Sequence, residues 1–109
     1  EGIARYGSFY VPMDEALAHV VLDFSGRPLL VWRAEIPKVV LGNLETEMIE
    51  EFFRAVASES GLTLHVRLLY GQNTHHIVEA IFKAFARALA EAVAIDARVK
   101  GVMSSKGKL

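Results

Sequence analysis

The side chains best suited to chemistry are two adjacent histidines and a nearby carboxylate, His75, His76 and Glu79. Apolar residues at helical spacing follow them, which predicts that all three lie in the first turns of a helix. Neighbouring residues of a helix point about 100° apart, and residues three or four positions apart share a face. The three side chains are therefore expected to converge, and their nitrogen and oxygen atoms suit a divalent cation.

A simpler interpretation of this helix remains open. Glu79 precedes Lys83 by four residues, which is the spacing of a helical ion pair. Arg87 precedes Glu91 by the same spacing. The polar side chains could thus form a solvated face whose pairs each contribute roughly a few tenths of a kcal/mol. Three ligands from one helix would also leave coordination positions that other segments must fill.

Periodicity along the chain predicts the elements that position this helix. Alternating apolar and polar residues predict strands over 15–24, 29–36 and 62–70, and helical spacing predicts helices over about 45–58 and 74–95. The turn residues at 25–28 indicate that the first two strands form a hairpin. Asn73 or Thr74 is expected to cap the last helix. The order is β-β-α-β-α, an α+β sheet with both helices packed on one face.

The same patterns predict which side chains are buried. In the helix over 45–58, the residues at helical spacing form the expected buried stripe: Met48, Ile49, Phe52, Phe53 and Val56. The last helix carries many alanines, whose small side chains would let other elements approach closely. His19 and His65 alternate with apolar residues, so they are interpreted as strand-face residues and not as metal ligands.

The two ends of this single domain differ from the core over 15–95. Residues 1–14 lack an initiator Met, and we expect them to be an extended N-terminal arm at the start of a fragment. Residues 96–109 are polar, basic and interrupted by glycine. They are predicted to be a flexible tail that orders only on an anion.

Composition limits the kind of protein. Of the 109 residues, 52% are hydrophobic and the mean hydropathy is +0.29, so we expect some apolar surface to be buried between subunits. The net charge of −1 and the lack of a basic block argue against nucleic acid as a partner. No signal peptide and no apolar run of about 18 residues is apparent, which indicates neither secretion nor a membrane span. The absence of cysteine fits a reducing cytoplasm and restricts metal ligands to nitrogen and oxygen.

Three motifs in order, RYGSFYVPMDEALAHVVLDFSGRP, LHVRLLYGQNTHHIVEAIFKAFARALAEA and SSKG, resemble the C-terminal half of the imidazoleglycerol-phosphate dehydratases. The resemblance covers nearly the whole chain. It implies a half-domain with a fold like domain 2 of ribosomal protein S5, paired in the family with a similar first half and assembled into a large symmetric shell. It also implies a hydro-lyase of histidine biosynthesis, which uses manganese to convert imidazole glycerol phosphate to imidazole acetol phosphate.

The resemblance further implies roles for individual residues. The metal ligands would be His75, His76 and Glu79, with Glu51 at the position of a further histidine ligand in many members. Asp14 would be a carboxylate near the reacting carbons, and Glu79 both a ligand and the base. The residues expected to hold the substrate's phosphate are Arg5, Arg27, Lys83, Ser104 and Lys106. Guanidinium and ammonium groups suit phosphate, and a mobile tail could close over it.

The implied mechanism is metal-assisted proton abstraction, in which manganese binds the substrate's imidazole and a carboxylate removes the carbon-bound proton. Because the family's first half is missing from this sequence, two hypotheses follow. The chain is either the enzyme's second half, acting with a separate first-half chain, or a metal-binding homo-oligomer that is weakly active or inactive. A metal-free binding domain is a third interpretation.

Overall fold

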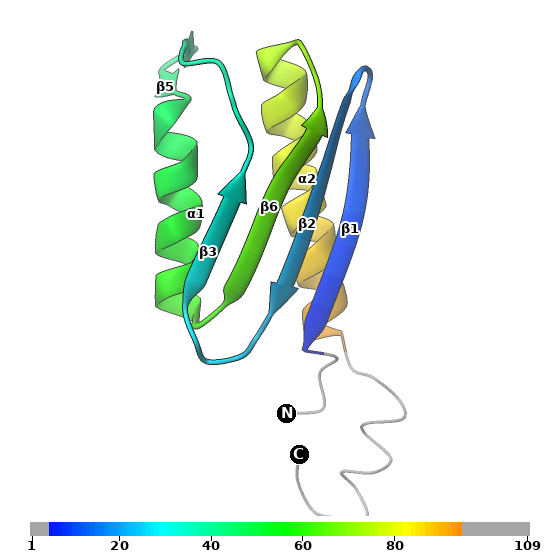
Figure 1. Ribbon diagram of the computed structural model, residues 1–109, viewed down its shortest axis with the longest axis vertical. Coiled ribbons are helices and arrows are strands. Elements are labelled where there is room, and N and C mark those ends of the chain that lie inside the picture. Colours follow the sequence, from blue (N-terminus) through cyan, green and yellow to red (C-terminus); the bar gives the residue numbers. More distant parts are fainter. Residues whose placement is uncertain (1–4, 95–109) are drawn as a thin grey trace, which may run out of the picture.

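The computed structural model describes residues 5–94, which form one mixed sheet covered by two helices. In chain order the elements are β1 (Tyr6–Met13), β2 (Ala16–Asp23), β3 (Leu29–Arg33), β4 (Val40–Leu41), β5 (Leu44–Glu45), α1 (Glu47–Ser60), β6 (Thr63–Tyr70) and α2 (Thr74–Val93). The main sheet has the order β1-β2-β6-β3, and β4 and β5 form a separate small ladder. Both helices lie on the same side of the main sheet (Figure 1). This confirms the predicted α+β class.

The predicted hairpin between the strands over 15–24 and 29–36 is wrong, because β6 lies between β2 and β3. β6 pairs antiparallel with β2 and parallel with β3. The chain does reverse direction after β2, as its turn residues indicate, but it leaves a gap one strand wide. Leu64 and Val66 of β6 are 0% and 1% exposed, so the strand that fills this gap has a buried apolar inner face.

Most of the expected extended N-terminal arm forms the edge strand β1, Tyr6–Met13. Every residue from Tyr6 to Met13 pairs with β2, in a register that runs from Tyr6 opposite Asp23 to Met13 opposite Ala16. Pro12, which cannot donate a backbone hydrogen bond, is tolerated because β1 lies at the sheet edge. Most β1 side chains are exposed or half-buried, which weakens the alternating pattern that would reveal a strand.

The core lies between the sheet and the helices. Phe53 of α1 packs against both β3 of the sheet and α2. Its side chain is 0% exposed. Its ring centroid lies 5.0 Å from that of Phe82 and 5.2 Å from that of Phe85, both on α2, and 5.9 Å from that of Trp32 on β3. The fully buried side chains of the sheet and of α2 belong to the same core: Ala16, Ala18, Val20, Leu22, Leu64, Val66, Ile77, Ala80, Ile81, Ala84, Ala88 and Ala92.

The predicted buried stripe of α1 is only partly correct. Ile49 and Phe53 are buried, but Met48 and Phe52 are 53% and 47% exposed. α1 lies beside β3 at the edge of the sheet (Figure 1), so only a narrow stripe of this helix meets the core. Met48 and Phe52 therefore form an exposed apolar surface on α1.

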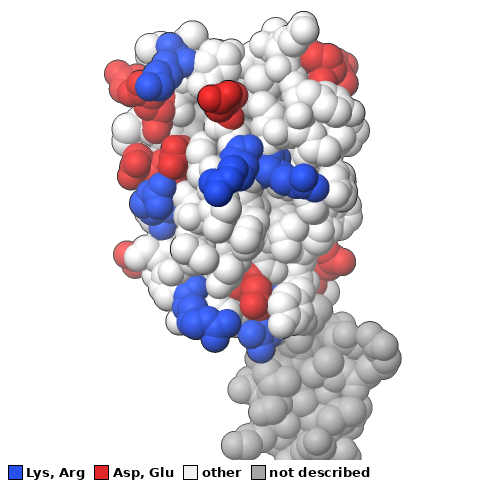
Figure 2. Space-filling model, viewed as in Figure 1, with Lys and Arg blue, Asp and Glu red and all other residues white. Residues whose placement is uncertain are grey.

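The other face of the sheet carries no helix within residues 5–94 (Figure 1). Figure 2 shows that this face is mostly uncharged, with basic side chains near its middle. Arg33, His65 and Arg67 border a shallow cavity of about 350 Å³ there. His19 lies on the same face, where its ring stacks on Tyr10 at a centroid distance of 3.8 Å. Neither helix of the described part of the chain is both long enough and apolar enough to cross a membrane.

Candidate metal centre

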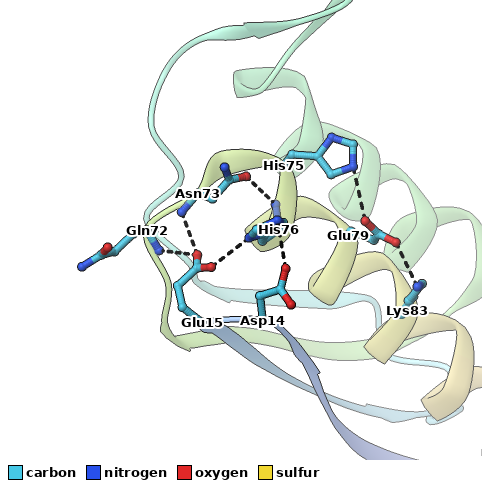
Figure 3. Close-up of polar contacts among 8 residues, drawn as sticks. All are labelled: Asp14, Glu15, Gln72, Asn73, His75, His76, Glu79 and Lys83. Atoms are coloured by element: carbon cyan, nitrogen blue, oxygen red, sulfur yellow. Dashed lines mark hydrogen bonds and ion pairs between the residues drawn. The ribbon is translucent and has the colours of Figure 1, made fainter.

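The candidate metal centre lies at the start of α2, and the turn from β6 into α2 positions it. Gly71 packs so tightly that a β-carbon there would lie 2.9 Å from the β-carbon of Ala16 on β2. Asn73 then caps α2 as predicted, since its side chain accepts a hydrogen bond from His76 N at 3.0 Å. His75 and His76 consequently occupy the first turn of α2, beside the turn that joins β1 to β2 (Figure 3).

His75 pairs with the carboxylate one turn along the helix. His75 Nε2 lies 3.3 Å from Glu79 Oε1, and Lys83 Nζ lies 2.9 Å from Glu79 Oε2. The hydrogen bond from Lys83 holds the pKa of Glu79 below its usual value, so this carboxylate is ionised at neutral pH. His75 and Glu79 border a cavity of about 370 Å³ together with Leu41 and Gly42. A nitrogen and an oxygen donor thus face open space.

His76 belongs to a different group of side chains. Its Nδ1 lies 2.8 Å from Glu15 Oε1, and its Nε2 lies 3.3 Å from Asp14 Oδ2. The hydrogen bond with Glu15, assisted by the charges of the nearby carboxylates, raises the pKa of His76. Asp14 has a φ of +52°, a left-handed conformation that aspartate tolerates in tight turns. The β1–β2 turn therefore places carboxylates against both imidazole nitrogens (Figure 3).

Glu15 links this turn to the helix start, and the sequence did not reveal it. Its Oε2 accepts backbone hydrogen bonds from Asn73 N at 2.8 Å and Gln72 N at 2.9 Å. These bonds, that to Asn73 first, and the bond from His76 lower the pKa of Glu15 to about 2. The only signal in the sequence is an acidic residue beside Asp14 ahead of a strand. Its backbone partners are 57 and 58 residues away, a separation that no local pattern spans.

The expected convergence of His75, His76 and Glu79 on one ion is not found. The two imidazole centroids lie 6.5 Å apart with their planes at 85° (Figure 3). Within residues 5–94, no group of three or more His, Asp or Glu side chains is arranged to hold a metal ion. The reason is the rotation of about 100° between neighbouring helical residues, which turns His75 toward Glu79 and His76 toward the β1–β2 turn.

The donors fit a divalent metal in type but not in number. Imidazole nitrogens and carboxylate oxygens suit manganese and similar ions. His75 with Glu79, and His76 with Asp14, each offer two donors, fewer than the usual coordination number of such an ion. Each pair could serve only as part of a site that another chain or another copy completes.

Glu51, the further predicted ligand, is exposed on α1, and the described residues do not join it to either pair. Its role as a ligand stays a prediction. The simpler interpretation of α2 is also partly realised, since Glu79 and Lys83 do form an ion pair. Glu91 instead accepts a hydrogen bond from Ser8 N at 2.8 Å, which ties the far end of α2 to β1.

Two of the residues predicted to bind phosphate, Arg5 and Arg27, lie far from the histidines, whereas Lys83 pairs with Glu79 beside them. Arg5 N donates to Ala92 O at 2.8 Å, which places Arg5 at the C-terminal end of α2, about 25 Å along the helix from His75. Its guanidinium lies 2.7 Å from Asp23. Arg27 is exposed in the loop after β2 at that same end of the sheet (Figure 1). Ser104 and Lys106 lie outside the described residues.

Comparison with known proteins decides what kind of chain this is. The sequence profile described as imidazoleglycerol-phosphate dehydratase matches residues 1–89. The chain belongs to the imidazoleglycerol-phosphate dehydratase family. Relatives of that name from Acetivibrio thermocellus and Moorella thermoacetica are 63% and 59% identical over all 109 residues.

Solved structures of the family share the fold. The imidazoleglycerol-phosphate dehydratase of Staphylococcus aureus has a TM-score of 0.85 and 52% identity, over 88% of this chain and 56% of the other. The enzyme of Pyrococcus furiosus, solved in complex with (S)-C348, has a TM-score of 0.81 and 36% identity, over all of this chain and 60% of the other. The chain likewise spans about half the length of the curated relatives it matches, 56% of each of the first two.

Proposed function

We propose that this chain is the second half of a manganese-dependent imidazoleglycerol-phosphate dehydratase. The reaction would remove water from imidazole glycerol phosphate to give imidazole acetol phosphate, a step of histidine biosynthesis, in the cytoplasm. The observation that carries the proposal is the paired donor geometry at the start of α2, in a chain that belongs to this family. His75 with Glu79, and His76 beside Asp14, are side chains with the chemistry that a manganese-dependent dehydration needs.

His75, His76 and Glu79 would hold the metal, with Glu51 as a further oxygen ligand. Since the two donor pairs are separate, each would be completed by the first half of the family's enzymes or by another copy of the chain. When bound, manganese supplies Lewis acidity that stabilises negative charge developing on the imidazole ring of the substrate.

Carboxylates of this chain would move the proton. Glu79 is kept ionised by Lys83, so it can accept a proton from the substrate's carbon. The electron pair of the broken C–H bond would form a C=C double bond to the ring-bearing carbon as hydroxide leaves that carbon, and the resulting enol would tautomerise to the ketone of the product. Asp14 is exposed at 3.3 Å from His76 Nε2, and it would lie near these reacting carbons. The hydroxide takes up a proton and leaves as water.

Phosphate recognition would be shared between copies. Lys83 lies just over two turns from His75 on α2 and pairs with Glu79, so it can serve the same site. Arg5 and Arg27 lie at the far end of the sheet, so they would contact the phosphate in a site formed with another chain. Ser104 and Lys106, in the tail, would be further phosphate ligands. This division requires that the active enzyme be an assembly.

Light scattering with size exclusion tests the proposal, on chain stripped of metal and then given Mn²⁺, alone or coexpressed with a first-half chain of the family. We expect dehydratase activity only in fractions that contain both halves and Mn²⁺. The His75→Ala, His76→Ala double variant should abolish this activity. The matched control is His65→Ala, a histidine exposed on the open sheet face. Failure of the reconstituted halves to turn over substrate would refute the proposal.

A metal-binding homo-oligomer with weak or no activity is the second candidate. It is favoured by the incomplete donor pairs and by the apolar surface at Met48 and Phe52, which a second copy could cover. In that case Mn²⁺ alone would drive assembly of this chain. Adding the first half would then change neither its mass nor its activity.

A further inference from the structure

We infer that Glu15 is a positioning residue that keeps the proton of His76 on Nδ1 and so presents Nε2 as the nitrogen that binds metal. The inference rests on the proposed function, because it gives Glu15 a role toward the metal. It is carried by three short hydrogen bonds that converge on one carboxylate at the meeting point of the β1–β2 turn and α2 (Figure 3).

The backbone holds the Glu15 carboxylate in place. Its Oε2 accepts from the amides of Gln72 and Asn73, which are fixed by the turn into α2. Its Oε1 then faces His76 Nδ1 at 2.8 Å. An ionised carboxylate has no hydrogen to donate, so Nδ1 must carry the proton of this hydrogen bond. The other nitrogen of a neutral His76 is thereby left with its lone pair free.

The free nitrogen, Nε2, faces the exposed carboxylate of Asp14. Nε2 lies 3.3 Å from Asp14, whose side chain is 73% exposed and can move aside. The imidazole of His76 is itself only 29% exposed and is fixed at its base by the helix start. Carboxylate partners of this kind set the tautomer and orientation of metal-binding histidines in other proteins.

Glu15→Gln provides a sharp test because it keeps the shape of the side chain. The backbone amides of Gln72 and Asn73 can only donate, so the oxygen of the new side-chain amide must take the place of Oε2. The NH₂ group of that amide then faces His76 Nδ1 and donates to it. The proton of neutral His76 must therefore move to Nε2, the nitrogen that would bind metal. A residue with a purely structural role would leave this tautomer unchanged.

Nitrogen NMR of the metal-free full chain reads the tautomer directly, at about pH 9, where imidazole is neutral. The His76 signals are assigned by their loss in His76→Asn. We expect Nδ1–H in the wild type and Nε2–H in Glu15→Gln. The matched control is Glu91→Gln, which changes a carboxylate that also accepts a backbone hydrogen bond, from Ser8 N, but contacts no histidine. It should leave the His76 signals as in the wild type.

Mn²⁺ binding, followed by electron paramagnetic resonance, separates this inference from the proposed function. We expect Glu15→Gln to weaken Mn²⁺ binding by about 10–100-fold, while Glu91→Gln leaves it unchanged. An Nε2–H tautomer in the wild type, or an unchanged tautomer in Glu15→Gln, would overturn the role of Glu15 even if Mn²⁺ binds. A chain with the expected tautomers that binds no Mn²⁺, alone or with the first half, would overturn the proposed function and with it the role toward metal.

Discussion

Gly7 of β1 and Ala88 of α2 touch through their backbones. A β-carbon on Gly7 would lie 2.7 Å from the carbonyl carbon of Ala88 and closer still to its oxygen. Because these are backbone atoms, no rotation of a side chain could relieve the overlap. The contact depends on the row of buried alanines on α2, which lets this helix lie directly on β1 and β2. The packing of α2, and so the position of the histidines at its start, is sensitive to a single methyl group.

Gly7→Ala should therefore destabilise the fold strongly. We expect the free energy of unfolding to fall by about 2–4 kcal/mol, since the new methyl group would push α2 away from the sheet. Denaturation by urea, followed by circular dichroism, measures this. Gly26→Ala is the control: no atom lies within 4 Å of its added β-carbon, and only its φ of +79° causes strain, which costs about 1–2 kcal/mol. Equal losses for the two variants would show that the Gly7 contact is not tight in solution.

Phe53 and Phe52 are neighbours with opposite surroundings. Phe53→Ala should cost about 3–5 kcal/mol of unfolding free energy, because it empties the centre of the core. Phe52→Ala removes a ring that is 47% exposed and should cost less than about half as much. Urea denaturation at low protein concentration compares them. A large, concentration-dependent loss for Phe52→Ala would instead show that another chain covers this face of α1.

These contrasts show how far local pattern predicts the fold. Alternation along β2 and β6 and the cap at Asn73 could be read because each depends on neighbours in the sequence. The position of β6 between β2 and β3 could not be predicted, because a turn sets the direction of the chain but not which strands pair. The exposure of Met48 and Phe52 depends on how much of α1 the edge strand β3 can cover. That is a property of the assembled sheet.

The candidate site divides in the same way. His75, His76 and Glu79 were identified from spacing on one helix, and all three do lie at the start of α2. The three side chains do not converge on one ion as expected, because the partners of His76 come from the β1–β2 turn. Glu15 was missed since its contacts cross the sheet. Local periodicity finds donors on one element, whereas the groups that orient them come from elements that meet only in the folded chain.

The low pKa of Glu15 predicts a specific response to acid. The folded-state pKa, about 2, lies below the usual 4.5. The ionised carboxylate therefore stabilises the fold fully above about pH 4.5, and this contribution is lost as the pH falls toward 2. Urea denaturation of wild type and Glu15→Gln across this range should show the wild type's advantage shrinking with acid. A difference between the two that does not change with pH would mean that Glu15 does not act through its charge.

The raised pKa of His76 predicts the opposite dependence of stability on pH, and bound metal should reverse that dependence. Its folded-state pKa is raised above 6.5, so in metal-free chain its contribution to stability is present below pH 6.5 and is lost as the pH rises through the raised value. His76→Asn should remove this dependence. Mn²⁺ needs the neutral imidazole, so it should stabilise the assembled protein most at the higher pH, and a chelator should abolish that gain. Thermal melting with Mn²⁺ or with chelator, at several pH values, measures both effects. If Mn²⁺ raised the melting temperature equally at all pH values and equally in His76→Asn, the metal would bind elsewhere.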